Sequence, residues 1–368
     1  MKLTFEQSDL LKSVNISMKA VSSSTTMPIL ECIMIDATAG EIRFISNDME
    51  LGIETIVPGT ILEKGSVALD AKTFSEIVRR LPNSLVTIET DDQMVSQITC
   101  EKAKFTIPGK SGDEFTYLPV VEKNDSVTMS QFSLRQIINQ TLFSVGENIV
   151  GNRILTGEQF FIKDGILRVA SLDSHRVSIR TIEMEKDCPD ESVVIPGKTL
   201  GEISRLLTGG TDAQVTVCFS KNYVIFEFDQ TMVLSRLLEG HFFDVDQLLM
   251  DDYTTKVELN KQSLIQCINR ASLLVRESDK VPVVFDIRDN EMSLSANTTM
   301  GSMNETLEIL KEGKDLTIGF NPKYVTDALR VIEDETITIY FLSSVAPCFI
   351  KNDEKGYNYI VLPVNIGR

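Results

Sequence analysis

The sequence predicts an α+β protein built from three tandem copies of one domain fold. Two helix-like segments each occur three times at domain-sized intervals, and short alternating or β-branched segments typical of antiparallel strands surround them. The chain has 368 residues, of which 42% are hydrophobic and 24% are charged, as in an ordinary globular protein. Three copies of about 120 residues are each long enough to bury a core of their own.

The first repeated segment spans residues 6–21, and its further copies span 130–145 and 260–275. Shared apolar positions recur at i, i+4 and i+11, which is one face of a 3.6-residue helix, and a polar residue opens each copy. The intervals of 124 and 130 residues have the size of a domain and are too long for a solenoid repeat. The matched positions are Glu6, Ser130 and Asn260; Leu10, Leu134 and Leu264; Val14, Ile138 and Ile268; Asn15, Asn139 and Asn269; and Val21, Val145 and Val275.

A second helix is predicted at 72–79, 198–205 and 323–330. Lysine, an acidic residue and arginine occupy the same three columns in every copy, and a residue typical of turns or helix starts precedes each one. These columns hold Lys72, Lys198 and Lys323; Glu76, Glu202 and Asp327; and Arg79, Arg205 and Arg330, and the preceding residues are Asp70, Pro196 and Pro322.

Strands are predicted in the rest of each copy, at 40–45, 67–69 and 85–90, at 165–170, 193–195 and 215–219, and at 291–296, 316–318 and 336–341. The polar tip Lys221-Asn222 predicts an antiparallel hairpin with 223–228. We expect both helices of each copy to pack on one face of an antiparallel sheet. Polar joins at 121–126 and 250–255 predict domains at 1–122, 123–252 and 253–368.

Several functional classes have little support. The start of the chain lacks a signal-like apolar segment and no run approaches a membrane span, so we expect a cytoplasmic protein without a membrane partner. The six cysteines form no CxxC pair and are expected to be reduced and mostly buried, without a metal site. With two histidines, no GxSxG and no phosphate loop, the sequence contains no catalytic constellation, and we expect no cofactor.

The positive charge is concentrated in the predicted helices. The windows 7–21, 72–81, 131–145, 197–207, 261–276 and 322–331 hold 13 Lys or Arg against 4 Asp or Glu, a net charge of +9, whereas the whole chain carries −17. Solvated helix faces often display lysine and arginine, which is one explanation. A segregated basic surface on an acidic protein is also typical of contact with a phosphate backbone. The candidate DNA-facing residues are Lys12, Lys19, Lys72, Arg79, Arg80, Arg135, Lys198, Arg205, Lys261, Arg270, Lys323 and Arg330.

Three such repeats resemble the bacterial DNA sliding-clamp family, that of the β subunit of DNA polymerase III. The resemblance covers the whole chain, and its most specific marks are the segments 172–177 (LDSHRV), 239–245 (EGHFFDV) and 359–366 (YIVLPVNI). It implies clamp domains that form half of a six-domain ring, made by a head-to-tail homodimer around duplex DNA. It also implies a non-catalytic processivity factor for the replicative DNA polymerase, bound regardless of DNA sequence.

The resemblance further implies a hydrophobic pocket for short peptide motifs of the polymerase, the clamp loader and repair polymerases. Only the second copy has His-Arg in the turn after its strand, although His175 could also be a turn residue with a local role. The family usually has proline where Phe243 stands and often arginine where Asn365 stands, which would alter peptide preference. Carried over by matching motif, the pocket residues are Leu155, Leu172, Ser174, His175, Arg176, Val177, Phe243, Leu248, Ile360, Leu362, Pro363, Val364, Asn365 and Ile366.

For the contact between protomers, the resemblance implies Phe105, Ile107, Leu273 and Leu274, each of which could equally belong to a core. The alternative to a clamp is a three-domain protein-binding scaffold whose basic helices face solvent or another protein, without DNA encirclement.

Overall fold

The computed structural model describes residues 1–22, 25–123, 125–146, 152–184, 188–249, 252–275 and 281–366. Residue 276 of one basic helix window, and residues 124, 250 and 251 of the predicted joins, lie outside this range. The chain divides into two compact units: unit 1 comprises 1–135 and 202–237, and unit 2 comprises 136–201 and 238–368. Among the described residues, no helix is long and apolar enough to cross a membrane.

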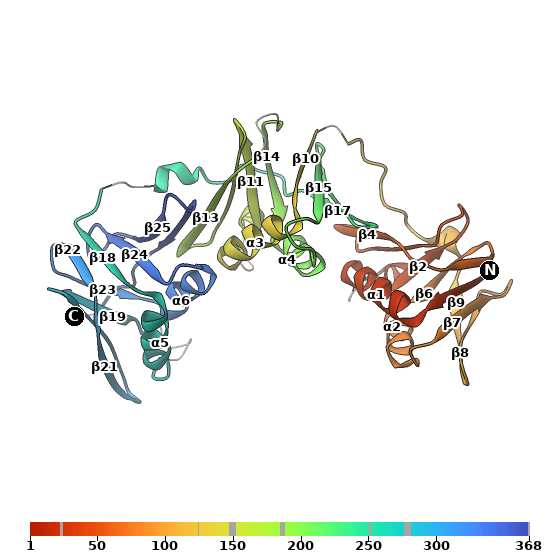
Figure 1. Cartoon of the computed structure of the whole chain (residues 1–368), viewed down its shortest axis with the longest axis horizontal. Helices are drawn as coiled ribbons and strands as arrows, with labels where there is room; N and C mark the ends of the chain where they lie inside the picture. Colours follow the sequence, from red (N-terminus) through yellow and green to blue (C-terminus); the bar gives the residue numbers. More distant parts are fainter. Residues whose placement is uncertain are drawn as a thin grey trace. The chain divides into compact units, whose positions relative to one another are not determined.

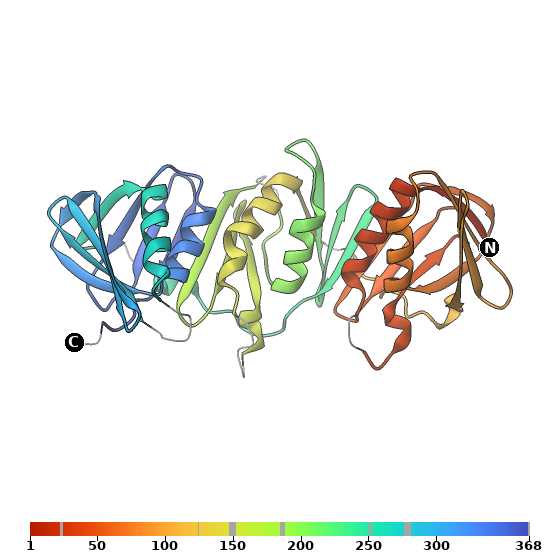
Figure 2. The same ribbon diagram turned by 90° about the horizontal axis from the view of Figure 1, so that it is seen from below.

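Unit 1 contains one antiparallel sheet of thirteen strands in the order β10-β15-β16-β17-β4-β3-β2-β6-β9-β8-β7-β1-β5. Two α-helices, α1 (Gln7–Ser17) and α2 (Ala71–Arg80), contact each other and lie side by side against this sheet (Figures 1 and 2). The strands are β1 (Lys2–Glu6), β2 (Cys32–Asp36), β3 (Arg43–Asn47), β4 (Leu51–Ile56), β5 (Thr60–Glu63), β6 (Ser66–Asp70), β7 (Leu85–Thr90), β8 (Val95–Cys100), β9 (Ala103–Lys110), β10 (Asp125–Ser130), β15 (Gln214–Phe219), β16 (Tyr223–Phe228) and β17 (Thr231–Arg236).

Unit 2 contains a nine-stranded sheet, β14-β11-β12-β13-β26-β25-β24-β18-β22, and a four-stranded sheet, β21-β20-β19-β23. Helices α5 (Lys261–Ser272) and α6 (Pro322–Val331) also contact each other (Figure 2). The strands are β11 (Gly157–Lys163), β12 (Ile166–Leu172), β13 (Arg176–Glu183), β14 (Glu191–Pro196), β18 (Thr255–Asn260), β19 (Val283–Arg288), β20 (Glu291–Thr298), β21 (Gly301–Glu308), β22 (Leu310–Gly313), β23 (Leu316–Phe320), β24 (Thr336–Phe341), β25 (Cys348–Asn352) and β26 (Tyr357–Val361).

The order of the elements confirms the threefold repeat. Each copy runs through a strand, a helix, four or five strands, a second helix and three strands, with α3 (Gln131–Thr141) and α4 (Gly197–Leu206) as the helices of the second copy. The predicted strands are found within three residues of their expected bounds, and the 215–219 and 223–228 segments form the expected hairpin. The fold class, α+β with antiparallel sheets and six α-helices among the described residues, is therefore confirmed.

Helix starts follow the capping residues in the sequence. The side-chain oxygens of Asp70, Ser130 and Asn260 each accept a hydrogen bond from the backbone N–H three residues later, at 2.8 to 3.0 Å. Glu6 caps no helix N–H with its side chain in the described structure. The long predicted segments end early, because α1 and α3 tighten into single 3₁₀ turns after Ser17 and Thr141.

The predicted apolar columns face the cores. Leu10, Leu134 and Leu264 are all fully buried, and burial of each such side chain stabilises the fold by about 1.5–3 kcal/mol. The copies share two continuous sheets, because β17 pairs with β4 in unit 1 and β13 pairs with β26 in unit 2. These two strand junctions bring segments from different copies together and position the sites described next.

Candidate functional site

The turn between β12 and β13 is organised by one carboxylate. Oδ1 of Asp173 accepts hydrogen bonds from the backbone N–H groups of His175 at 2.7 Å and Arg176 at 3.0 Å. Aspartate accepts such local bonds readily, which is why it is favoured in turns. The turn leaves His175 exposed at the surface and directs Arg176 inward, so the two adjacent side chains have different environments.

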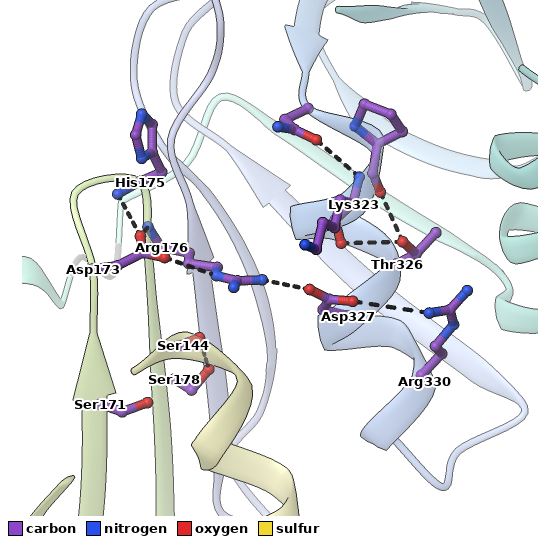
Figure 3. A network of polar contacts seen from close by, with 12 residues as sticks. Ser144, Ser171, Asp173, His175, Arg176, Ser178, Lys323, Thr326, Asp327 and Arg330 are labelled. Atoms are coloured by element: carbon purple, nitrogen blue, oxygen red, sulfur yellow. Dashed lines mark hydrogen bonds and ion pairs between the residues drawn. The ribbon is translucent and has the colours of Figure 1, made fainter. Parts of the chain in front are cut away.

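Arg176 connects the second copy to α6 of the third (Figure 3). Its Nε donates to Asp173 at 3.1 Å and its Nη1 donates to Asp327 at 2.6 Å. The guanidinium carbon lies 4.7 Å from the ring centre of Tyr324 and 5.4 Å from that of Phe143. Arg176 is only 9% exposed, so its charge is removed from water and depends on these partners.

An apolar cluster lies beside this network. Leu172, Val177 and Ile360 are buried in it, and Leu155 and Leu248 pack on it from two short 3₁₀ helices. The structure therefore brings together five of the predicted pocket residues from four separate parts of the sequence. The sequence prediction missed further members of the cluster, which are Ala170, Ile179, Phe242, Val245, Tyr340 and Phe349.

The C-terminal run is docked rather than free, as its apolar composition predicts. The backbone N–H of Leu362 donates to the carbonyl of His175 at 2.8 Å, and that of Val364 donates to Gly319 at 2.8 Å. A Cβ atom on Gly319 would lie 2.9 Å from Ile366, so the tail passes directly over this glycine. Leu362, at the junction, is 38% exposed, and Phe243, which follows the cluster residue Phe242, is 44% exposed.

A buried polar layer lies under the junction. The Ser171 hydroxyl donates to the carbonyl of Thr141 at 2.6 Å, and the hydroxyls of Ser144 and Ser178 lie at 2.5 Å from each other. Glu158 is fully buried, and its carboxylate oxygens accept no hydrogen bond from any described residue. Burial raises the pKa of Glu158 well above its usual range, against a smaller lowering effect of the nearby Thr141 hydroxyl.

The lysine, acid and arginine columns of the second helices form the same local arrangement in each copy. Arg79 pairs with Glu76 at 2.9 Å, Arg205 pairs with Glu202 at 2.6 Å, and in α6 Arg330 lies 3.9 Å from Asp327. These arginines are 56 to 63% exposed, so each i,i+3 pair contributes at most about 0.5 kcal/mol. The acidic column therefore positions the arginines without removing them from solvent.

The remaining basic candidates differ in their partners. Arg135 donates to the carbonyl of Leu207 at 3.0 Å, and Lys261 donates to that of Ile332, so both of these side chains bond to backbone carbonyls within their own unit. Three others have acidic partners: Lys19 pairs with Glu202, Arg80 with Glu76, and Arg270 with Glu305. Lys12 and Lys72 are exposed and form no ion pair within the described residues, whereas Lys198 and Lys323 are exposed and have partners.

The four residues expected at a protomer contact separate into two groups. Phe105 is 39% exposed and Leu273 is 78% exposed, whereas Ile107 belongs to the core of unit 1 and Leu274 is half-buried. Phe105 lies on the part of β9 that pairs only with β8, because β6 reaches β9 only at its last two residues. In unit 2, β21 forms the outer edge of the four-stranded sheet. Within the part of the chain that the structure describes, this stretch of β9 and strand β21 each pair with another strand on one side only.

Comparison with known proteins identifies the family. The descriptions "DNA polymerase III beta subunit, N-terminal domain", "central domain" and "C-terminal domain" match residues 1–119, 128–244 and 246–365, in that order. The beta sliding clamp of Staphylococcus epidermidis is 31% identical over 375 residues, with 99% of both chains covered. The chain belongs to the DNA polymerase III beta subunit family.

Solved structures of the beta subunit family agree over the full length. The DNA polymerase sliding clamp of Bacillus subtilis is 33% identical with a TM-score of 0.95, and covers 99% of both chains. A protein of solved structure from Eubacterium rectale is 54% identical with a TM-score of 0.96, also over 99% of both chains. The chain is thus a beta sliding clamp, the non-catalytic processivity factor of DNA polymerase III.

Some residues around the β13–β26 junction were not predicted from the sequence. Asp173 stands in the segment that carries the resemblance, but its role in the turn depends on the backbone conformation around it. Tyr324 and Asp327 lie in the second helix of the third copy, about 150 residues from Arg176, and no local pattern connects them. No sequence pattern indicated that Glu158 is buried, because a buried glutamate cannot be distinguished from a solvent-exposed one by sequence alone. No group of three or more His, Cys, Asp or Glu among the described residues could hold a metal ion.

Proposed function

We propose that two copies of this chain form a head-to-tail ring that encircles duplex DNA and holds replication proteins through a peptide groove at the β13–β26 junction. The observation that carries the proposal is the meeting of the 173–176 turn with the docked C-terminal run over one apolar cluster. The partners are the replicative polymerase, the clamp loader and repair polymerases, each through a short peptide motif. We infer a cytoplasmic location, where a bacterial chromosome is replicated.

The groove has the chemistry of a site for an extended apolar peptide. Leu362 offers open apolar surface beside the buried cluster, and Phe243 follows the cluster residue Phe242. The rings of His175 and Tyr324 are tilted against each other, with their centres 5.3 Å apart. A few polar groups around an apolar floor fix a peptide in one orientation. Arg176 is committed to two carboxylates, so we assign it to holding the groove in shape rather than to direct contact with the peptide.

A single substitution tests the groove. Leu362→Asp should weaken binding of a labelled clamp-motif peptide at least tenfold, because a charge enters the apolar rim. Leu310→Asp is the matched control, since Leu310 is 68% exposed on β22 and lies outside the groove. Fluorescence polarisation measures both variants. Unaltered affinity in Leu362→Asp would reject the assignment, as would equal weakening in the control.

We infer that the basic helix residues attract the DNA backbone without reading its sequence. A closed ring retains DNA by topology, so weak attraction is sufficient, and an acidic remainder of the chain disfavours other contacts. The clamp should therefore stay on nicked circular DNA and slide off linear DNA, whereas a protein-binding scaffold would show no such difference. Lys12→Ala with Lys72→Ala should lower DNA retention and its salt dependence, and Lys64→Ala with Lys102→Ala should not. Equal behaviour of the two pairs would contradict this role.

For the protomer contact, we propose that the free edge of β9 in one protomer adds to β21 of its partner. Backbone hydrogen bonding between the two edges would satisfy groups that are otherwise open. Lys104 on β9 and Glu308 on β21 have opposite charges, which favours this pairing. Phe105 and Leu273 would supply apolar contact at its margin, with domains 1–122, 123–252 and 253–368 as the building blocks.

The solution mass tests the ring. Light scattering should give about twice 41.1 kDa for the native chain. Leu273→Asp should shift the mass toward one chain, because Leu273 is 78% exposed and would bring a charge into the contact. Leu310→Asp again serves as the control. A native monomer at micromolar concentration, or a Leu273→Asp variant that remains fully dimeric, would refute this contact.

A further inference from the structure

A cavity lies at the strand junction where β17 pairs with β4 inside unit 1. Its volume is about 240 Å³, and none of its lining residues belongs to the proposed peptide groove. This volume is below the roughly 300–1,000 Å³ of pockets for drug-sized ligands, so it suits one or two side chains and not a nucleotide. The lining residues that matter here are Asn47, Met49, Leu51, Tyr117, Leu118 and Tyr223.

The cavity repeats the construction of the groove in unit 2. Oδ1 of Asp48 accepts from the backbone N–H groups of Glu50 at 3.0 Å and Leu51 at 2.7 Å, as Oδ1 of Asp173 does in the other turn. The tripeptide Leu-Pro-Val also occurs at both junctions, as residues 118–120 and 362–364. The same turn, the same strand pairing between copies and the same tripeptide therefore come together twice in the chain.

The two sites differ in the residues that follow the aspartate-organised turn. Leu51 and Gly52 occupy the positions that Arg176 and Val177 occupy in the second copy. A Cβ atom on Gly52 would lie 2.0 Å from Cδ2 of Leu118, so only glycine allows Leu118 to rest on this backbone and form the wall of the cavity. The unit 1 site thus has an apolar wall without the guanidinium network of the unit 2 groove.

The rim of the cavity exposes large apolar side chains. Met49 is 54% exposed and Tyr117 is 51% exposed, and Val120 next to them is fully exposed. Met49 has a φ of 76°, in the left-handed region, where a non-glycine residue costs about 1 kcal/mol or more. Methionine adapts its shape to apolar ligands, so the exposed Met49 side chain can contact an apolar group at the rim.

Acidic residues outnumber basic ones around the rim, where Arg236 lies opposite the lining residue Tyr223 and donates its backbone N–H to the carbonyl of Glu50. Glu50 lines the cavity, and Asp36 and Asp113 are close enough to Tyr117 that, after burial itself, their carboxylates raise the pKa of its hydroxyl. A ligand with positive charge next to its apolar group is therefore favoured over an acidic one. This distinguishes the cavity from the unit 2 groove, whose turn carries His175 and Arg176.

We propose that this cavity is a second peptide-docking site, which takes a short extended segment of a partner protein with one large apolar side chain beside lysine or arginine. The choice of a peptide as ligand rests on the proposed function of the unit 2 groove, whose construction the cavity repeats. Its occupation would let the chain hold two partners through different segments at the same time.

The probe is a pair of fluorescein-labelled peptides, Gly-Lys-Arg-Leu-Phe and its acidic counterpart Gly-Glu-Glu-Leu-Phe, titrated into the full chain. Met49→Gly removes the apolar side chain and relieves the backbone strain, so this variant should fold at least as well as the native chain. Tyr117→Ala is the second variant. Met300→Ala is the matched control, because Met300 is an equally exposed methionine in the corresponding turn of the third copy.

We expect the basic peptide to bind with at least tenfold higher affinity than the acidic one. Both cavity variants should weaken it about tenfold, while Met300→Ala and deletion of residues 362–366 leave it unchanged. No saturable binding, equal binding of both peptides, or full binding by Met49→Gly would overturn the proposal. A change of oligomeric mass in Met49→Gly would also overturn the proposal, because it would mean that a second copy of the chain occupies the cavity. If the deletion leaves the clamp-motif peptide bound, the unit 2 groove fails instead.

Discussion

Replacement of Arg176 by alanine should loosen the contact between β13 and α6 by about 3 kcal/mol. The change removes two charge-assisted hydrogen bonds, each of which contributes about 1.5–3 kcal/mol. The loss should be smaller than the sum of both hydrogen-bond contributions, because Asp173 still accepts hydrogen bonds from two backbone N–H groups and Asp327 still lies 3.9 Å from Arg330. Both carboxylates are 17% exposed, so the loss of their buried cation is not compensated by water alone.

Native-state hydrogen exchange is the suitable assay, because a chain with several cores does not unfold in one two-state step. Amides of β13 and α6 should exchange about 100-fold faster in Arg176→Ala, since each 1.4 kcal/mol is a factor of ten. Arg79→Ala is the control: this arginine is 56% exposed with one acidic partner, and its pair contributes below about 1 kcal/mol. A double-mutant cycle with Asp327→Asn should give a coupling of about 1–3 kcal/mol. Equal protection in the two arginine variants would refute the network.

Three further predictions concern burial and packing. Glu158→Gln should stabilise unit 2 by about 1–3 kcal/mol near neutral pH. Because the pKa of Glu158 is raised in the folded state, the contribution of the native carboxyl to the free energy of unfolding is fully present below its unfolded pKa. That contribution is lost as pH rises through the folded pKa. Gly52→Ala should cost about 1–3 kcal/mol, because the new Cβ displaces Leu118. Cys348 should react with iodoacetamide far more slowly than Cys188, since burial raises the pKa of the Cys348 thiol to about 12 whereas Cys188 is half-buried.

Each of these has a discriminating measurement. Chemical denaturation of Glu158→Gln at a series of pH values should show the gain over the native chain disappearing in acid; a gain that is independent of pH would contradict a raised pKa of the buried carboxyl. Gly210→Ala is the control for Gly52→Ala, because a Cβ at Gly210 meets no atom within 4 Å. Mass spectrometry of peptides after timed alkylation compares the cysteines, and equal rates would contradict the burial argument.

Much of the fold could be predicted because the three copies of the repeat can be compared with one another. Columns shared by three copies, such as Leu10, Leu134 and Leu264, identify buried helix faces without any other sequence for comparison. The bounds of strands and helices followed from alternation and capping residues, which act locally. The site was predictable only through the resemblance, since residues that meet at the β13–β26 junction come from positions near 155, 175, 248 and 360.

By itself, the sequence determined three α+β copies, the face each helix buries, and the concentration of positive charge on the helices, because these depend on periodicity and composition within one segment. Only the tertiary structure decided that Arg176 is buried between Asp173 and Asp327, that Glu158 is fully buried without a hydrogen-bond partner among the described residues, and that Met49, Leu118 and Tyr223 line one cavity. The physical reason is that burial and pairing are set by which strands of different copies share a sheet. The sequence around one residue does not indicate which residue more than one hundred positions away will contact it.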